Sequence, residues 1–156
     1  MSVAAAGFMT REIRRCPGFS PLPAPQVLVV DDDRNILHAL GRILRVERWQ
    51  LALATNGRDA EARVAAGRFD LVLSDYNMPG GTGVDLFSAI RAKDPRVRLV
   101  MMSGSVRRLP WDRLESLNVS AVVPKPWDAP HLRWTLRTSL GHLFELPREL
   151  DRRRTR

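Results

Sequence analysis

The sequence contains a single cysteine, Cys16, so no disulfide can form within the chain. Cys16 also has no nearby residues that would act with it as metal ligands. Structural disulfides are typical of oxidising compartments and rare in the cytoplasm. The scarcity of cysteine therefore favours a reducing, cytoplasmic setting.

Long apolar runs are missing as well. No segment approaches the ~20 apolar residues that a membrane-spanning helix needs. The N-terminal stretch has two short apolar patches separated by Thr10, Arg11 and Glu12. It lacks the continuous apolar centre of a secretory signal. We expect no membrane partner.

Basic residues outnumber acidic ones and give a formal net charge of +8, yet no segment concentrates them as a DNA-reading helix would. Residues 1–25 and 145–156 each carry +2, and the remaining +4 is spread over residues 26–144. The only dense run, Arg152 to Arg154, is interpreted as part of a solvated tail. We therefore expect no nucleic-acid partner, although a nucleic-acid-binding or scaffold protein that uses its basic ends remains an alternative.

Proline separates the N-terminal segment from the rest. Pro17, Pro21, Pro23 and Pro25 disfavour helix and central strand, so residues 1–25 are predicted to be a flexible Pro-rich leader. Residues 26–144 are long enough for one domain with a well-filled core. Residues 145–156 are predicted to be a basic C-terminal tail.

Strand patterns and helix patterns alternate five times within residues 26–144. Continuous apolar runs are typical of parallel strands that are buried on both faces, and apolar residues at helical spacing follow each run. The predicted strands are 26–30, 50–54, 70–74, 97–102 and 119–123, and the predicted helices are 36–44, 59–66, 84–92, 110–117 and 130–144. Strands joined by crossover helices form a parallel sheet with helices on both faces. The fold class is therefore α/β, a doubly wound (βα)5 arrangement around a five-stranded parallel sheet.

Acidic, hydroxyl or amino side chains, which can bind ions or take part in reactions, follow four of these strands. Asp31, Asp32 and Asp33 follow the first strand, Asp75 the third, Ser103 the fourth and Lys125 the fifth. In open parallel sheets, such residues meet beyond the carboxyl ends of the strands. Clustered carboxylates repel one another, and a hard divalent cation such as Mg²⁺ relieves that repulsion. From this inventory we expect Asp32 and Asp75 to bind Mg²⁺ directly and Asp31 to act through water.

The side chains expected to meet beyond these strand ends would also suit a phosphoryl group, whose oxygens need charge neutralisation and hydrogen-bond donors. Lys125 supplies a positive charge and Ser103 a hydroxyl donor. A carboxylate can itself act as the nucleophile and form an aspartyl-phosphate. Asp75 is the best candidate, because it ends the middle strand beside the Gly-rich loop MPGGTG.

Four segments together resemble the receiver domain of bacterial two-component response regulators, the CheY-like family. They are VLVVDDD, DLVLSDYNMPGGTGVDL, LVMMSGS and VVPKPW. Their order and spacing also fit, with 43 residues from Asp32 to Asp75, 28 more to Ser103 and 22 more to Lys125. The resemblance spans roughly residues 26–142 and implies a flavodoxin-like fold.

The resemblance implies that Asp75 accepts a phosphoryl group from a histidine of a sensor kinase or phosphotransfer protein. It implies Mg²⁺ as the cofactor, held by Asp31, Asp32, Asp75 and the backbone carbonyl of Asn77. Ser103 would hydrogen-bond the phosphoryl oxygens and Lys125 would ion-pair with them. The chain would catalyse only its own phosphorylation and dephosphorylation, and would not be an enzyme in the usual sense.

Several positions carry further expectations. Asp33 is expected to cap the following helix, Gly83 resembles a loop glycine that adopts positive φ, and Pro126 matches a proline that follows a cis peptide bond in the family. Val122 departs from the family, which commonly has an aromatic residue three places before the lysine. A conformational switch that depends on a moving ring is therefore not expected.

We expect a stand-alone receiver that signals by protein contact, because no output domain follows the last predicted helix. An alternative is a Mg²⁺-dependent phosphatase with an aspartate nucleophile, since Asp31-x-Asp33 formally satisfies the D-x-D pattern of such enzymes. The series from Asp75 to Lys125 fits the receiver family better.

Overall fold

The computed structural model describes residues 23–141. The predicted C-terminal tail and all but residues 23–25 of the predicted leader lie outside the described residues. The strands are β1 Gln26–Val30, β2 Gln50–Ala54, β3 Leu71–Asp75, β4 Asn77–Met78, β5 Gly81–Thr82, β6 Arg98–Ser103 and β7 Ala121–Pro124. The α-helices are α1 Arg34–Leu44, α2 Gly57–Ala66, α3 Gly83–Lys93, α4 Trp111–Ser116 and α5 Ala129–Leu140, with 3₁₀ turns η1 Arg45–Glu47 and η2 Val106–Arg108.

The predicted five-stranded parallel sheet is confirmed. Its strand order is β2-β1-β3-β6-β7, and every neighbouring pair is parallel. The order reverses direction next to β1, as in doubly wound sheets, so the carboxyl ends of β1 and β3 border the crevice where such folds place polar groups. β2 and β7 form the two edges of the sheet.

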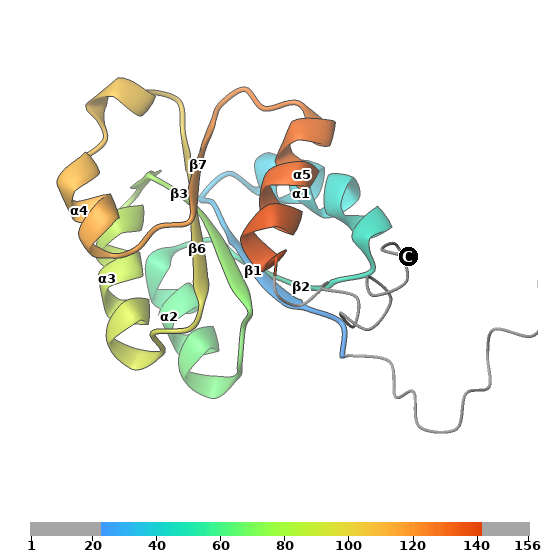
Figure 1. The fold of residues 1–156 in the computed structure, drawn as a ribbon, viewed down its shortest axis with the longest axis horizontal. Coiled ribbons are helices and arrows are strands. Elements are labelled where there is room, and N and C mark those ends of the chain that lie inside the picture. The colour runs from blue at the N-terminus through green and yellow to red at the C-terminus, as the bar shows by residue number, and fades with distance from the viewer. Residues whose placement is uncertain (1–22, 142–156) are drawn as a thin grey trace, which may run out of the picture.

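Helices cover both faces of the sheet and bury two apolar layers (Figure 1). α2, α3 and α4 pack on one face, where Leu28, Val30 and Val72 point toward them. α1 and α5 pack on the other face against Val27 and Val29. Successive residues of β1 thus face opposite layers, which is why its sequence is apolar throughout rather than alternating.

The structure differs from the predicted boundaries mainly around α4 and in the Gly-rich loop. The strand predicted to start at Val119 begins at Ala121, because Val119 closes a turn in which its N–H donates to the Leu114 carbonyl at 3.0 Å. The loop MPGGTG contributes to a short hairpin, β4 with β5, that apolar patterning does not reveal. In the part of the chain that is described, no helix is both long and apolar enough to cross a membrane.

The expected role of Gly83 is wrong, because the positive φ in this loop belongs to Gly80, at +84°. Gly83 is required for a different reason, namely close packing. A Cβ atom at this position would lie 2.4 Å from the Asp75 carbonyl oxygen and 2.9 Å from the Met101 sulfur. The first turn of α3 can therefore approach the end of β3 only if residue 83 has no side chain.

Gly83→Ala is expected to destabilise the protein by about 1–3 kcal/mol, because the added methyl group must displace backbone as well as a side chain. Urea denaturation measures the change. Gly41→Ala in α1 is the matched control, since a Cβ there meets nothing within 4 Å and removing a mid-helix glycine stabilises by roughly 0.5–1 kcal/mol. Equal stability of the Gly83→Ala variant and the native protein would contradict the packing argument.

Candidate functional site

The carboxyl ends of four neighbouring strands bring the predicted site residues to one edge of the sheet. Asp31 follows β1, Asp75 ends β3, Ser103 ends β6, and Lys125 follows β7. Asp31, Asp75 and Ser103 are buried, with relative exposures of 1%, 8% and 1%. The sequence placed these side chains together by strand order alone, and the structure shows that they share one buried edge.

The Lys125 ammonium links the two buried carboxylates. Its Nζ lies 2.7 Å from Asp31 Oδ2 and 2.8 Å from Asp75 Oδ1. The remaining oxygen of each carboxylate accepts a backbone N–H, from Asp33 at 2.9 Å for Asp31 and from Asn77 at 3.1 Å for Asp75. Both carboxylates are thus oriented by the chain that immediately follows their strands.

Burial and the ion pairs act in opposite directions on the pKa values of this cluster. Burial raises the pKa of Asp31 above its ordinary 3.8, although hydrogen bonds from Lys125 and the Asp33 N–H oppose this. Burial alone would lower the pKa of Lys125, but its hydrogen bonds to Asp31 and Asp75 and their negative charges raise it. The ion pairs therefore stabilise the protonated, charged form of Lys125. Burial, by contrast, destabilises the ionised form of Asp31.

The raised pKa predicts a pH-dependent effect of Asp31→Asn. Below pH 3.8 the native carboxyl is protonated in both the folded and unfolded states and carries no penalty. As the pH rises through the folded-state pKa, the native protein loses stability because the buried carboxylate ionises. Without divalent cations, Asp31→Asn should therefore be more stable than the native protein at pH 7, and the difference should vanish below pH 3.8. Urea denaturation across this range measures it, and a difference of constant size would contradict the argument.

The neighbouring aspartates have separate positions. Asp33 caps α1, since its Oδ1 accepts the Asn35 N–H at 2.8 Å, which confirms the capping prediction. Asp32 is exposed at the same edge. Because Asp33 is engaged at the helix N-terminus, the D-x-D pattern does not place a second free carboxylate beside Asp31.

Sequence reasoning missed two contacts of the site. The Trp127 ring centroid lies 5.8 Å from Lys125 Nζ, within the range of a cation–π interaction. The Ser74 hydroxyl donates to the Asp75 carbonyl at 2.9 Å, so the backbone of Asp75 is held by Ser74 and packed against Gly83. No spacing rule reveals either contact. The first depends on how the loop after β7 packs, and the second is a local hydrogen bond between adjacent residues of β3. The Lys125–Pro126 peptide bond is cis, as the resemblance implied.

Comparisons with known proteins agree with this geometry. The family model of the response regulator receiver domain matches residues 27–137, and the chain belongs to that family. Among solved structures, the CheY-like receiver from Methanospirillum hungatei superposes with a TM-score of 0.73 at 22% identity and covers 77% of this chain and 96% of that one. TrrA from Thermotoga maritima, solved in complex with Mg²⁺-BeF, has a TM-score of 0.67 at 28% identity, covering 74% of this chain and 98% of that one.

Curated relatives are longer than this chain. The transcriptional regulatory protein PrrA from Mycobacterium tuberculosis is 37% identical over 98 residues, which are 63% of this chain and 41% of that protein. ZraR from Salmonella typhimurium is 35% identical over 128 residues, which are 80% of this chain and 28% of that protein. The chain therefore spans less than half the length of these relatives, and the stand-alone receiver stays a prediction.

Receiver domains generally bind Mg²⁺, and the donor set here fits that ion. A cationic group, the Lys125 ammonium, already lies between Asp31 and Asp75. With Asp32 included, three carboxylates against one ammonium leave two formal negative charges. Among residues 23–141, no three histidine, cysteine or acidic side chains are placed so that they could hold a metal ion by themselves. This inventory is typical of Mg²⁺, which is commonly held by one or two carboxylates and retains several waters.

Proposed function

We propose that the chain is a phosphoacceptor in two-component signalling, and that Asp75 receives the phosphoryl group from a phosphohistidine of a sensor kinase or phosphotransfer protein. The observation that carries this proposal is the Lys125 ammonium held between Asp31 and Asp75 at 2.7 and 2.8 Å. It provides a fixed positive charge directly beside the proposed nucleophile, where negative charge accumulates during phosphoryl transfer.

In the proposed step, a carboxylate oxygen of Asp75 attacks phosphorus. A P–O bond forms, the P–N bond to the donor imidazole breaks, and its electron pair returns to the imidazole ring. Lys125 then pairs with the phosphoryl oxygens. Ser103 Oγ already accepts the Ser105 N–H at 3.1 Å, so its own hydroxyl hydrogen is available to a phosphoryl oxygen.

The proposed Mg²⁺ ligands are Asp31, Asp32, Asp75 and the backbone carbonyl of Asn77. When bound, the ion would neutralise the charge of the carboxylates and of the incoming phosphoryl group. The exposed position of Asp32 leaves its carboxylate accessible to an ion at the edge of the site. Asp31 is orientated toward Asp75 by the Asp33 N–H and Lys125.

The proposed response to phosphorylation passes through Ser103 and Lys125. Val122 is half-buried in the layer shared with α3 and α4 and has no ring that could change position. Attraction of Ser103 and Lys125 to the phosphoryl group would bias an equilibrium between two conformations of the loops after β6 and β7. The conformation that results would be recognised by a target protein.

The experiment is labelling of the purified chain with a small phosphodonor such as acetyl phosphate, followed by intact-mass spectrometry. With Mg²⁺ present, we expect a mass gain of one phosphoryl group that is reversed by neutral hydroxylamine, as an acyl phosphate requires. Excess EDTA should reduce the initial rate by on the order of a hundredfold or more, because charge neutralisation at the phosphoryl group is lost. Labelling that resists hydroxylamine, or that proceeds equally in EDTA, would overturn the proposal.

A further inference from the structure

A groove lies at the β2 edge of the sheet, away from Asp75. Two hollows, about 270 and 570 Å³, share Leu37, His38 and Leu53 and are therefore adjacent. The first reaches Asp59 and Arg63 of α2, and the second extends along α1. Because α1 and α2 cover opposite faces of the sheet, a hollow lined by both must pass around the edge strand.

One stripe of α1 forms most of the groove wall. Its residues recur at helical spacing, Arg34, Leu37, His38, Gly41 and Arg42, and Arg45 at the start of η1 continues the stripe. Leu37 and the half-buried Leu53 of β2 make an apolar floor, and a side chain at Gly41 would meet nothing within 4 Å. The groove thus has an apolar base and unfilled space beside it.

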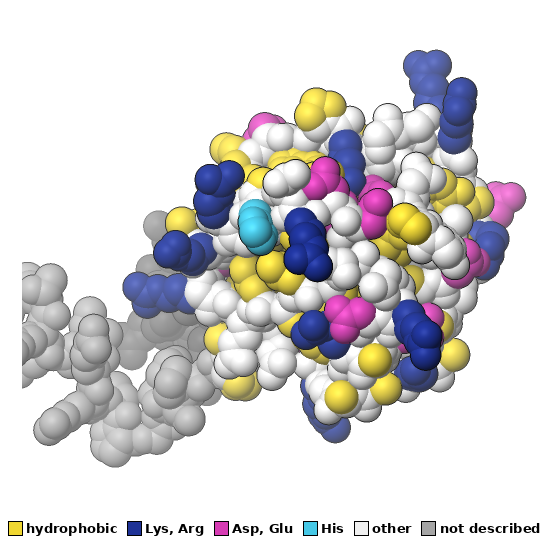
Figure 2. All heavy atoms as spheres, turned by 180° about the vertical axis from the view of Figure 1, so that it is seen from behind, with side chains coloured by type: hydrophobic (Ala, Val, Ile, Leu, Met, Phe, Trp, Pro, Cys, Tyr) yellow, Lys and Arg dark blue, Asp and Glu magenta, His cyan; other side chains and the backbone are white. Residues whose placement is uncertain are grey.

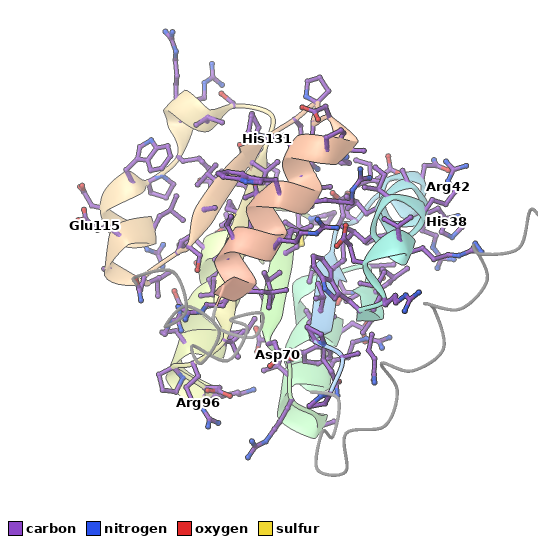
Figure 3. All side chains as sticks on the ribbon, turned by 45° about the vertical axis from the view of Figure 1, so that its right-hand side comes forward. His38, Arg42, Asp70, Arg96, Glu115 and His131 are labelled. Carbon is purple, nitrogen blue, oxygen red and sulfur yellow. The ribbon has the colours of Figure 1, made fainter. Side chains whose placement is uncertain are left out.

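The rim of the groove is strongly basic. Arg34, Arg42, Arg45 and Arg63 are all exposed, and the one acidic lining residue, Asp59, is already paired with Arg63 at 3.1 Å. His38 and Arg42 project from the same side of α1 (Figure 3). In Figure 2, dark blue basic side chains lie on both sides of a cyan histidine, with yellow hydrophobic atoms next to it.

The charge of Arg34 is unfavourable for the helix itself. Arg34 occupies the first position of α1, and the first turn contains no acidic residue. A cation at a helix N-terminus opposes the helix dipole, and like charges one turn apart repel each other. Arg42 lies in the last turn of α1 and Arg45 is its C-cap, where the helix dipole favours a cation. The case for an external anionic counterpart therefore rests on Arg34 at the N-terminus and on the mutual repulsion of Arg42 and Arg45.

The edge strand supplies a second recognition element. β2 has a hydrogen-bonded neighbour on one side only, β1. The Gln50 N–H donates to the Pro25 carbonyl at 2.9 Å, and the Ala54 carbonyl accepts the Asp31 N–H at 3.2 Å, so these groups point toward the β1 side. By the alternation of a strand, the main-chain groups of Leu51 and Leu53 point away from β1 and can pair with an added strand.

We infer that the groove along β2, walled by α1 and α2, binds an extended acidic segment of a partner protein. Main-chain pairing with β2 positions the segment, its acidic side chains meet Arg34, Arg42 and Arg45, and an apolar side chain contacts Leu37 and Leu53. The apolar floor favours a peptide over nucleic acid, because a sugar-phosphate backbone has no apolar side chain to bury against Leu37 and Leu53. This inference does not depend on phosphorylation of Asp75.

The test uses the full chain and a fluorescein-labelled peptide in which glutamate alternates with leucine, measured by fluorescence anisotropy. Arg34→Gln/Arg42→Gln/Arg45→Gln should weaken binding about tenfold. The matched control, Lys93→Gln/Arg107→Gln/Arg108→Gln, removes the same charge from exposed positions on α3 and η2 and should leave affinity within about twofold. Gly41→Leu fills the groove without changing charge and should also weaken binding about tenfold.

Four results would overturn the inference. Equal loss in the control triple variant would show a non-specific charge effect, and full affinity of Gly41→Leu would show that the groove is not the site. Tighter binding of a single-stranded oligonucleotide with the same arginine dependence would assign the rim to nucleic acid. If the arginines instead prevent β2 from pairing with a second copy of the chain, the groove triple variant would dimerise in sedimentation analysis and its affinity for the peptide would be unchanged.

Discussion

Asp75→Asn is expected to abolish phosphoryl incorporation from acetyl phosphate and Mg²⁺, a loss on the order of a hundredfold or more. The amide has no negatively charged oxygen to attack phosphorus, while the shape of the side chain is retained. The Lys125 ammonium keeps its partner Asp31 at 2.7 Å, so the variant should remain folded. Intact-mass spectrometry after labelling measures the loss, and circular dichroism confirms the fold.

Asp33→Asn is the matched control for this experiment. It makes the same chemical change two residues from Asp31, at a side chain that caps α1 instead of facing Asp75. Asparagine and aspartate are about equally good N-caps, so stability and labelling should both stay close to native. Native-level labelling of Asp75→Asn, or equal loss in Asp33→Asn, would refute the assignment of Asp75 as phosphoacceptor.

Lys125→Met is expected to destabilise the protein by about 3 kcal/mol at neutral pH in the absence of divalent cations. The side chain of Asp31 is 1% exposed and that of Asp75 is 11% exposed. Removing the ammonium leaves both carboxylates without their cationic partner, and breaking a buried ion pair typically costs about 3–5 kcal/mol. Because Lys125 and Asp75 are partly exposed, we expect a loss of stability at the lower end of this range. Urea denaturation in EDTA measures it.

Asp31→Asn/Lys125→Met provides the decisive comparison. If repulsion and desolvation of unpaired carboxylates cause the loss, removing the Asp31 charge should restore a large part of the stability lost in Lys125→Met. If the methionine simply packs badly near Trp127, the double variant should be no more stable than the single one. Mg²⁺ should also stabilise Lys125→Met more than it stabilises the double variant, since an ion can replace the missing ammonium.

The fold was largely predictable from the sequence because its main signals are local. The apolar runs within β1, β3 and β6 are VLVV, LVL and LVMM, and each is bounded by polar or charged residues. The regions predicted less well are those in which apolar patterning is weak. α4 has only six residues and one buried side chain, Leu114, and β4 and β5 have two residues each.

The candidate site was predictable to the level of which side chains meet. The strand order of a doubly wound sheet brings the carboxyl ends of β1, β3, β6 and β7 to one edge. The four side chains at these ends could therefore be grouped without coordinates: Asp31, Asp75, Ser103 and Lys125. Gly83 shows where this reasoning stops. Its sequence context suggested a backbone conformation, whereas the structure shows a packing requirement against the Asp75 carbonyl, which depends on how α3 docks.

The sequence by itself determined the order of strands and helices, the family to which the chain belongs and the side chains available at the acidic edge, because hydrophobic period and motif spacing are properties of the chain. Only the tertiary structure decided that Lys125 lies between Asp31 and Asp75 and that basic side chains border the β2 edge. These features depend on distances of a few ångströms between segments far apart in sequence. Desolvation and ion pairing depend on distances of a few ångströms between side chains, and the spacing of residues along the chain does not give these distances.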